Sequence, residues 1–371
     1  MNRNQNQRLL LNASEASAPF FVGVDVGATS MKIGLVDDLG RSIHVGAVDL
    51  NGKSSSFVAI RTEADPCDAV RLISESIRSI FKVLGIDEYR CCGIGLGIPG
   101  TMDLKTQCLR ELANLHGWNE FPITIELEKN IGKPVVFCND ANAAAFGEFW
   151  VGSAAKYPSV ALLTLGTGIG CGIILDGHSI NGSSGYGGEC GHIPIDSSEN
   201  AMLCGCGARG HLEAYAGALG VARRTLLLTN YRKSTIRNHI SPETRLSDIP
   251  RIVYEEAERG DELAIEIIVE TAKYLAIGIT SILHTIDPAC ILLAGAMTFG
   301  GKNSKVGKLF LQTVIDGIRK STFKAIVDNL AIDFSALGSD AGYIGAAGLA
   351  RNEYIDKNNN RKLLNKTIVK N

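Results

Sequence analysis

The sequence has no excess of charge of one sign and no long hydrophobic run. Its 37 lysines and arginines nearly balance 39 aspartates and glutamates, so the formal net charge is −2. Without a positive field, electrostatic binding to nucleic acid has no support. No apolar stretch reaches the ~20 residues that a membrane-spanning helix needs. We therefore expect neither nucleic acid nor a membrane among the partners of this protein.

The N-terminal segment lacks the apolar core of a secretory signal. Residues 1–19 are polar and are predicted to form a flexible leader, and we expect the protein in the cytoplasm. The ten cysteines are scattered, apart from Cys204 and Cys206, which predicts free thiols in place of disulfides. At 371 residues the chain exceeds the usual size of one hydrophobic core, so we expect two domains.

A glycine-rich turn at residues 27–29 joins two strands predicted within residues 20–36. Consecutive backbone N–H groups in such a turn can bind an anion. Asp25 precedes the turn and is a candidate Mg²⁺ ligand, directly or through water, while Lys32 adds positive charge. A plain β-hairpin with an aspartate at its mouth explains the same residues equally well.

An Asn139-Asp140 pair lies where a short apolar strand runs into an alanine-rich helix. Catalytic carboxylates of α/β proteins are typically found at the carboxyl end of a strand, where a helix begins. The alternative is that one of the two side chains only caps the helix.

The architecture of residues 20–36 recurs at residues 159–177, with a Gly-Thr-Gly turn at residues 166–168. Two such hairpins indicate a duplicated fold with one phosphate-binding turn in each half. Another apolar strand, at residues 289–297, contains small residues around Gly295 that let a base or phosphate approach the backbone. Helices are predicted at residues 65–84, 251–259 and 263–285.

Two other glycine patterns do not meet the requirements of a nucleotide motif. Gly95-x-Gly97-x-x-Gly100 matches the dinucleotide fingerprint, but Pro99 favours a loop and no acidic ribose partner follows at the proper strand end. Gly52-Lys53-Ser54 resembles part of a P-loop, but Ala47 stands where the first glycine is required. An NAD-dependent oxidoreductase is therefore the weaker hypothesis.

Four side chains of zinc-binding type gather in a short glycine-rich segment. They are His192, Cys204, Cys206 and His211. A closed Cys₂His₂ set leaves no coordination position for water, so the predicted zinc is structural and would anchor the loop that presents Glu189 and Glu213. Two reduced thiols in a surface loop are the alternative.

This segment resembles the signature of the ROK family (repressors, open reading frames and sugar kinases), and the resemblance covers residues 20 to 350 in the proper order. It implies an α/β fold of the actin-like ATPase (ribonuclease H-like) type, with two lobes and a central cleft for ATP and sugar. The small lobe would comprise residues 20–140, completed by a helix at 341–355. The large lobe would comprise residues 141–340, with the zinc loop at 187–213.

The resemblance also implies a role for each matching residue, with Asp140 as the base that takes the proton from the sugar hydroxyl. The implied sugar contacts are Gly100, Asn139, Asp140, Glu189, His192 and Glu213. The implied contacts to ATP and Mg²⁺ are Asp25, Gly27, Thr29, Lys32, Thr167, Gly168 and Gly295. Three positions depart from the family pattern: Ala28 replaces a turn glycine, His211 replaces a zinc-binding cysteine, and Ala294 replaces a glycine.

The implied activity is ATP-dependent phosphorylation of a hexose, with glucose and its O6 hydroxyl expected, and with ATP, Mg²⁺ and structural Zn²⁺ as cofactors. Other sugars remain open within the family, namely N-acetylmannosamine, N-acetylglucosamine, fructose and allose. A sugar-responsive repressor is the alternative from another class, but its helix-turn-helix domain needs a longer segment than residues 1–19. The family habit implies a homodimer or homotetramer.

Overall fold

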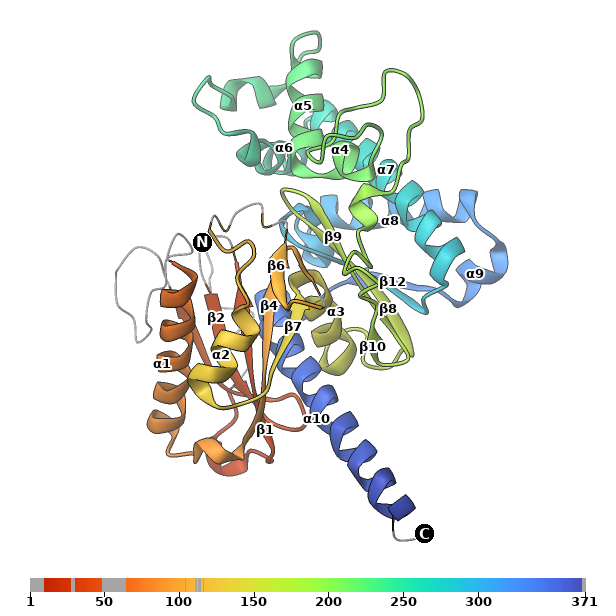
Figure 1. Ribbon diagram of the computed structural model, residues 1–371. Coiled ribbons are helices and arrows are strands. Elements are labelled where there is room, and N and C mark those ends of the chain that lie inside the picture. The colour runs from red at the N-terminus through yellow and green to blue at the C-terminus, as the bar shows by residue number, and fades with distance from the viewer. Residues whose placement is uncertain are drawn as a thin grey trace. The chain divides into compact units, whose positions relative to one another are not determined.

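The computed structural model describes residues 10–27, 31–48, 65–103, 105–110, 112, 115 and 117–368, without the side chains of 47–48 and 360–368. The chain forms two compact units, whose elements are labelled in Figure 1. Unit 1 comprises residues 1–152, 181–187 and 339–371, and unit 2 comprises residues 153–180 and 188–338. Within the described ranges no helix is both long and apolar enough to cross a membrane.

Unit 1 is built on a five-stranded sheet with the order β3-β2-β1-β4-β7. β2 is antiparallel to both β1 and β3, whereas β4 and β7 run parallel to β1. The strands are β1 (Phe20–Val26), β2 (Met31–Val36), β3 (Ser42–Val48), β4 (Cys91–Ile98) and β7 (Val135–Asn139). A separate two-stranded hairpin, β5 (Thr101–Asp103) and β6 (Cys108–Arg110), follows β4.

The two faces of this sheet differ because side chains alternate along each strand. On one face, aliphatic residues of β4 such as Ile94 and Leu96 share an apolar core with α1 (Pro66–Leu84) and α2 (Ile123–Ile131). The helix predicted at 65–84 is thereby confirmed as α1.

The other face of the sheet carries glycines, and α10 (Ala341–Ile368) lies directly against them. A Cβ atom on Gly23 would lie 1.7 Å from the carbonyl oxygen of Tyr343, and one on Gly95 would lie 1.8 Å from that of Ala346. Gly95, part of the misleading dinucleotide pattern, therefore serves helix–sheet packing.

The helix α3 (Asp140–Val151) also packs closely on α10, so it belongs to unit 1. A Cβ atom on Gly345 would lie 1.6 Å from the carbonyl oxygen of Ala143. The division between the units thus follows Gly152, whereas the sequence led us to place it after residue 140.

Residues 181–187 are likewise tied to unit 1, because Nδ2 of Asn142 donates a hydrogen bond of 3.0 Å to Oδ1 of Asn181. The C-terminal helix continues to Ile368, beyond the expected end at residue 355.

The second half of the predicted leader is attached to unit 1. Residues 13–15 form a short 3-10 helix, η1 (Ala13–Glu15), and the N–H of Leu11 donates a hydrogen bond of 2.9 Å to the carbonyl oxygen of Ser42. Ala13 and Ala16 pack against the core of the unit. Residues 10–19 are therefore held against unit 1 and do not form the flexible leader that we predicted. Residues 1–9 lie outside the described part of the chain.

Unit 2 repeats this topology, with a sheet of order β10-β9-β8-β11-β12. β8 and β9 form an antiparallel hairpin, and β11 and β12 run parallel to β8. The strands are β8 (Ser159–Leu165), β9 (Ile169–Leu175), β10 (His178–Ser179), β11 (Cys290–Ala294) and β12 (Ala331–Phe334). The duplication predicted from the two glycine turns is confirmed.

Six α-helices of unit 2 surround the sheet or extend from it (Figure 1). They are α4 (Leu212–Ala216), α5 (Ala218–Thr229), α6 (Ile249–Glu258), α7 (Glu262–Ile286), α8 (Lys305–Ser321) and α9 (Lys324–Asn329). The helices predicted at 251–259 and 263–285 correspond to α6 and α7. The remaining 3-10 helices are η2 (Glu88–Arg90), η3 (Cys190–His192), η4 (Thr235–His239), η5 (Leu246–Asp248), η6 (Ala296–Thr298), η7 (Gly301–Asn303) and η8 (Gly338–Asp340).

Candidate functional site

Asp140 and Asn139 occupy the junction of β7 and α3. The Oδ1 atoms of both side chains lie 2.9 Å from the N–H of Ala141, so Asn139 caps the helix as the alternative interpretation held. Nδ2 of Asn139 also donates a hydrogen bond of 2.9 Å to the carbonyl oxygen of Gly100. Burial raises the pKa of Asp140, while the hydrogen bond from Ala141 opposes this shift. The cap therefore fixes a carboxylate of increased basicity.

Asp25 lies close to Asp140 in the same unit. Burial and, to a lesser degree, the charge of Asp140 raise the pKa of Asp25, and Lys32 lowers it; the net value is about 6. Gly342, in the first turn of α10, makes room for Asp25, because a Cβ atom there would lie 2.3 Å from the carboxylate. Two buried carboxylates without a sufficient counter-charge are a favourable place for a divalent cation.

Lys32 is held within unit 1 by residues far away in the sequence. Its Nζ lies 2.7 Å from Oδ1 of Asp340, 2.8 Å from the carbonyl oxygen of Ser339 and 3.0 Å from Oγ of Ser339. All three donors of the ammonium group are therefore used. The structure thus places Lys32 in a cross-link between β2 and the start of α10, and its contact with ATP stays a prediction.

The second glycine turn lies between β8 and β9 and is fixed from two sides. The N–H of Ala218, at the start of α5, donates a hydrogen bond of 3.0 Å to the carbonyl oxygen of Gly166. Oε2 of Glu213 accepts a hydrogen bond of 2.9 Å from the N–H of Ile169. Gly168 has no room for a side chain, because a Cβ atom would lie 2.3 Å from Oε2 of Glu213, whereas the side chain of Thr167 is exposed.

Gly295 follows β11 with a backbone φ of 96°, in the region that favours glycine. A Cβ atom at this position would lie 2.2 Å from the carbonyl oxygen of Leu165, the last residue of β8. The residue therefore has to be glycine, and its backbone lies beside the start of the 166–168 turn.

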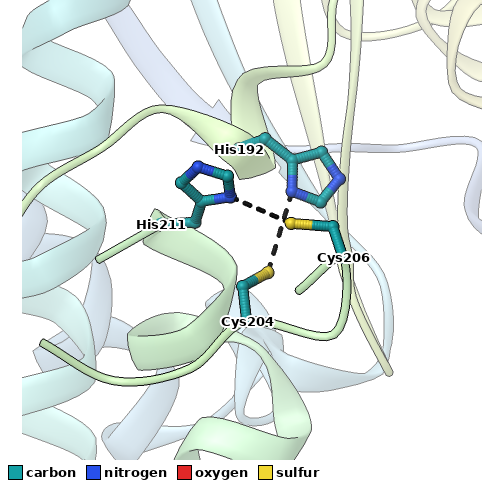
Figure 2. Close-up of side chains that lie close together, drawn as sticks. All are labelled: His192, Cys204, Cys206 and His211. Atoms are coloured by element: carbon teal, nitrogen blue, oxygen red, sulfur yellow. Dashed lines mark hydrogen bonds between the residues drawn. The ribbon is translucent and has the colours of Figure 1, made fainter. Parts of the chain in front are cut away.

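The four predicted metal ligands come together in unit 2, with all four donor atoms within 4.8 Å of one another. Figure 2 shows the two imidazole rings beside the two thiols. Nδ1 of His192 lies 3.7 Å from Sγ of Cys204, and Nδ1 of His211 lies 3.2 Å from Sγ of Cys206. Cys204 is buried and Cys206 is exposed, so the cluster lies at the surface of the unit.

The spacing of these donor atoms is close to that around a tetrahedral zinc ion. Zn–S bonds of about 2.3 Å and Zn–N bonds of about 2.1 Å place neighbouring ligand atoms roughly 3.4–3.8 Å apart. The loop is held in shape by its own backbone: the N–H of Cys204 donates to the carbonyl oxygen of Ala208, and that of Gly210 donates to Met202. The donor set is therefore competent for zinc with His211 in place of a cysteine.

His192 connects the metal cluster with a carboxylate. With Nδ1 directed toward the cysteines, its Nε2 lies 3.8 Å from Oε2 of Glu189. Glu189 precedes the short helix η3 and His192 is its last residue, so the two lie three positions apart on one turn. The imidazole thus presents one nitrogen to the metal site and the other toward the exposed Glu189.

Some site residues could not be placed or were not foreseen. Thr29 and Ala28 lie outside the described residues, so the first turn is defined only at Gly27 and by the strands on either side. The sequence reasoning missed Asp340 and Gly342. The available signal was a Ser-Asp pair before a helix rich in small residues, which is typical of a helix N-terminus.

Comparisons with known proteins agree with this geometry. The model of the ROK family matches residues 21–353. A glucokinase of Halalkalibacterium halodurans is 30% identical over 335 residues, which cover 90% of this chain and 96% of the relative. A xylose repressor of Caldicellulosiruptor bescii is 26% identical and is covered over 77% of its length, with 88% of this chain aligned.

Solved structures show the same fold. A ROK hexokinase from Thermus thermophilus matches with a TM-score of 0.73 and 28% identity, covering 91% of this chain and 99% of the other. A ROK glucokinase from Streptomyces griseus, in complex with glucose and AMPPNP, matches with a TM-score of 0.68 and 27% identity, covering 90% and 99%. The predicted actin-like α/β fold is thereby confirmed.

Proposed function

The chain belongs to the ROK family, and from this premise we propose that it is an ATP-dependent hexose kinase that converts glucose to glucose 6-phosphate. The observation that carries the proposal is the partly buried carboxylate of Asp140, held at the carboxyl end of β7 with a raised pKa. The glucokinase relatives and the similarity to a glucokinase that binds glucose and AMPPNP support ATP and glucose as the substrates.

Asp140 acts as the general base. It takes the proton from the sugar hydroxyl while that oxygen forms a bond to the γ-phosphorus of ATP and the bond to the β,γ-bridging oxygen breaks, which releases ADP. A carboxylate with a raised pKa is a stronger base toward the sugar hydroxyl. The cap at Ala141 and the link from Asn139 to Gly100 orient it.

The phosphate groups of ATP are bound by backbone N–H groups of the two glycine turns. We assign Gly27 and Thr29 to the first turn, Thr167 and Gly168 to the second, and Gly295 to the adenosine side. Asp25 would hold Mg²⁺, which supplies positive charge to the phosphates when bound. Burial and the charge of Asp140 raise the pKa of Asp25, and a bound cation would favour its ionised form.

The sugar is recognised by directional polar groups. We assign to sugar binding Asn139, the backbone of Gly100, Glu189, His192 and Glu213. Such contacts can discriminate by roughly 10⁴–10⁵ against analogues that lack a bonded hydroxyl. They do not by themselves choose glucose over N-acetylmannosamine, N-acetylglucosamine or fructose, which remain the alternatives within the family.

Zinc bound by His192, Cys204, Cys206 and His211 would stiffen the loop that presents these groups. Its ligand set is closed, so its contribution is structural. Zinc binding requires a thiolate at Cys204. Sγ of Cys204 would then no longer donate to Oε1 of Glu213, which lies 3.7 Å away, and this oxygen becomes available to a sugar hydroxyl.

An ADP-release assay against a panel of hexoses and N-acetylhexosamines tests the proposal. We expect turnover with glucose that depends on both ATP and Mg²⁺. Turnover with no sugar in the panel, together with specific binding to an operator-like DNA, would support a repressor like the xylose repressor relative instead. Two further proposals, a homodimer or homotetramer and a cytoplasmic location where ATP is available, rest on the family and on the need for ATP.

A further inference from the structure

Unit 2 has an open polar cavity at the carboxyl end of α5. It has a volume of about 310 Å³, at the lower end of the range typical of small-molecule sites. Its lining contains no acidic and no aliphatic residue, and three of its side chains are cationic. The lining residues are Asn230, Tyr231, Arg232, Lys233, Ser234, Arg237 and Asn238. An apolar ligand therefore finds no partner here.

The cavity is separate from the glycine turn at residues 166–168. That turn contacts the first residue of α5, whereas the cavity begins one residue after its last, Thr229. The helix has 12 residues and thus a length of about 18 Å. A molecule in this cavity would not overlap with one bound at the turn.

The segment that lines the cavity is rigidly anchored from beneath. Oδ2 of Asp261 accepts hydrogen bonds from Oγ of Ser234 at 2.9 Å and from the N–H of Thr235 at 2.7 Å. Oδ1 of the same carboxylate caps α7. Ile236 is fully buried in the core of the unit. The loop is therefore held in place without any ligand.

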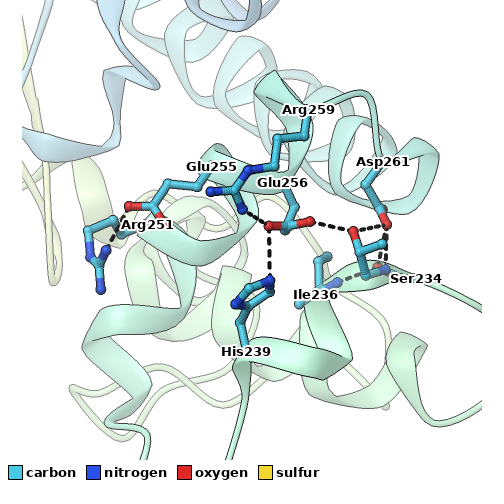
Figure 3. Close-up of polar contacts among 9 residues, drawn as sticks. Ser234, Ile236, His239, Arg251, Glu255, Glu256, Arg259 and Asp261 are labelled. Carbon is cyan, nitrogen blue, oxygen red and sulfur yellow. Dashed lines mark hydrogen bonds and ion pairs between the residues drawn. The ribbon is translucent and has the colours of Figure 1, made fainter.

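A second carboxylate, Glu256, is buried on the same side of the segment (Figure 3). It accepts hydrogen bonds from Oγ1 of Thr235 and from Arg259, and its Oε1 lies 3.3 Å from Nε2 of His239. The negative charges of this region thus serve the anchoring contacts beneath the loop.

The positive charges of the loop are not balanced in the same way. Arg232 pairs with Glu266 at 2.6 Å, but Lys233 and Arg237 have no carboxylate within ion-pair distance among the described residues. Other exposed arginines of unit 2, such as Arg245 and Arg251, have a carboxylate partner. Two unpaired cations therefore lie at one polar cavity.

We propose that this cavity binds a small phosphorylated polyol that carries two phosphate groups. Arg237 can donate two parallel hydrogen bonds to one phosphate, and Lys233 offers a point charge to the other. The exposed amides of Asn230 and Asn238 can both donate to and accept from hydroxyl groups. The phosphate groups supply the negative charge that the cavity lacks. The hydroxyl groups of the polyol form hydrogen bonds with the two asparagine amides.

Isothermal titration of the full chain with fructose 1,6-bisphosphate tests the proposal. AMPPNP, Mg²⁺ and glucose are present at saturation, so that any nucleotide and sugar sites are filled. We expect one saturable site, weakened by added salt. The double variant Lys233→Ser/Arg237→Ser should weaken binding by about tenfold or more, since two charge-assisted hydrogen-bond partners are lost. Unphosphorylated fructose should not bind this site.

The matched control is Lys320→Ser/Lys324→Ser, which removes two exposed cations elsewhere in unit 2. It should leave binding unchanged, and both double variants should keep the unfolding temperature and kinase activity of the natural protein. Three results would overturn the proposal: no saturation up to about 1 mM, equal weakening by the control, or binding of inorganic phosphate as tight as that of the bisphosphate. Because the readout is binding, these results do not depend on whether glucose is phosphorylated.

Discussion

Glu213 links the metal-binding loop to the second glycine turn, because its Oε2 accepts a hydrogen bond of 2.9 Å from the N–H of Ile169 while its Oε1 lies 3.7 Å from Sγ of Cys204. One carboxylate therefore contacts both a predicted zinc ligand and the turn to which we assign ATP phosphates. A residue that served the sugar alone would not need the contact to Ile169. The ATP and sugar requirements of the enzyme should thus be coupled through this side chain.

Substitution of Glu213 distinguishes the two roles. Glu213→Ala should raise the KM for ATP by about tenfold as well as the KM for the sugar, since a hydrogen bond to a charged group contributes about 1.5–3 kcal/mol. Glu213→Gln keeps an acceptor for Ile169, so its KM for ATP should stay closer to normal. Steady-state kinetics with each substrate varied provide the measurement. An unchanged KM for ATP in Glu213→Ala would limit the residue to sugar binding.

Substitution of Asp140 tests the general base. Asp140→Asn keeps an Oδ1 acceptor for the N–H of Ala141 and should fold normally, but kcat should fall by about 10²–10⁴. Asp87→Asn, at an exposed position of the same unit, is the matched control and should have normal kcat. Near-normal turnover of Asp140→Asn would exclude this residue as the base.

The raised pKa of Asp25 predicts how stability depends on pH. With a folded-state pKa of about 6, against 3.8 for the unfolded chain, the native state binds the extra proton between these values, so stability falls as pH rises from about 4 to 6. Asp25→Asn should therefore stabilise the ligand-free protein at pH 7.5 by up to about 3 kcal/mol, and by little near pH 4.

Urea unfolding of both proteins at the two pH values measures this difference. The same variant should lose Mg²⁺-dependent activity, since its carboxylate is the proposed magnesium ligand. Equal stability of Asp25→Asn and the natural protein at pH 7.5 would show that the buried charge is already compensated.

Metal analysis tests the zinc cluster. The purified protein should contain about one zinc per chain, and Cys204→Ser should lose it and lower the unfolding temperature, because structural zinc contributes directly to folding. Cys67→Ser removes an exposed thiol far along the chain and serves as the control. His211→Cys, which restores the usual family ligand, should retain zinc. Less than about half an equivalent of zinc with full activity would contradict a structural metal.

Two glycines of β4 give a matched test of the contact between the sheet and α10. A Cβ atom at Gly95 would lie 1.8 Å from the carbonyl oxygen of Ala346, whereas one at Gly93 would lie 3.5 Å from its nearest neighbour, which is ordinary contact. Gly95→Ala should therefore destabilise the protein by about 3 kcal/mol or more, and Gly93→Ala by less than about 1 kcal/mol. Denaturant unfolding measures both, and similar values would show that the helix is free to shift.

Local patterns in the sequence predicted the elements on which the chemistry depends. Asp140 at a strand end, the turn before Ile169 and the ligand spacing from Cys204 to His211 each involve residues close together in the chain, where a pattern determines the geometry. Within the metal cluster, only His192 lies farther away in the sequence from the other ligands.

Contacts between distant residues could not be predicted in the same way. Lys32 and Asp340 pair although they are 308 positions apart, and no local pattern in either segment predicts this pairing. Gly95 matched a dinucleotide pattern that we rejected, but its actual role was not predicted because the need for glycine comes from α10, far away in the sequence. The division after Gly152 was missed for the same reason, since the packing of α3 on α10 decides it.

The contact between α10 and the glycine face also sets an order for folding during synthesis. Unit 1 contains the first strands of the chain and its last helix, so one face of its sheet stays uncovered until the ribosome has released residues beyond Ala341. Unit 2 ends at Gly338 and is complete before that point. Although domains generally fold in the order of synthesis, the unit that is begun first in this protein is finished last.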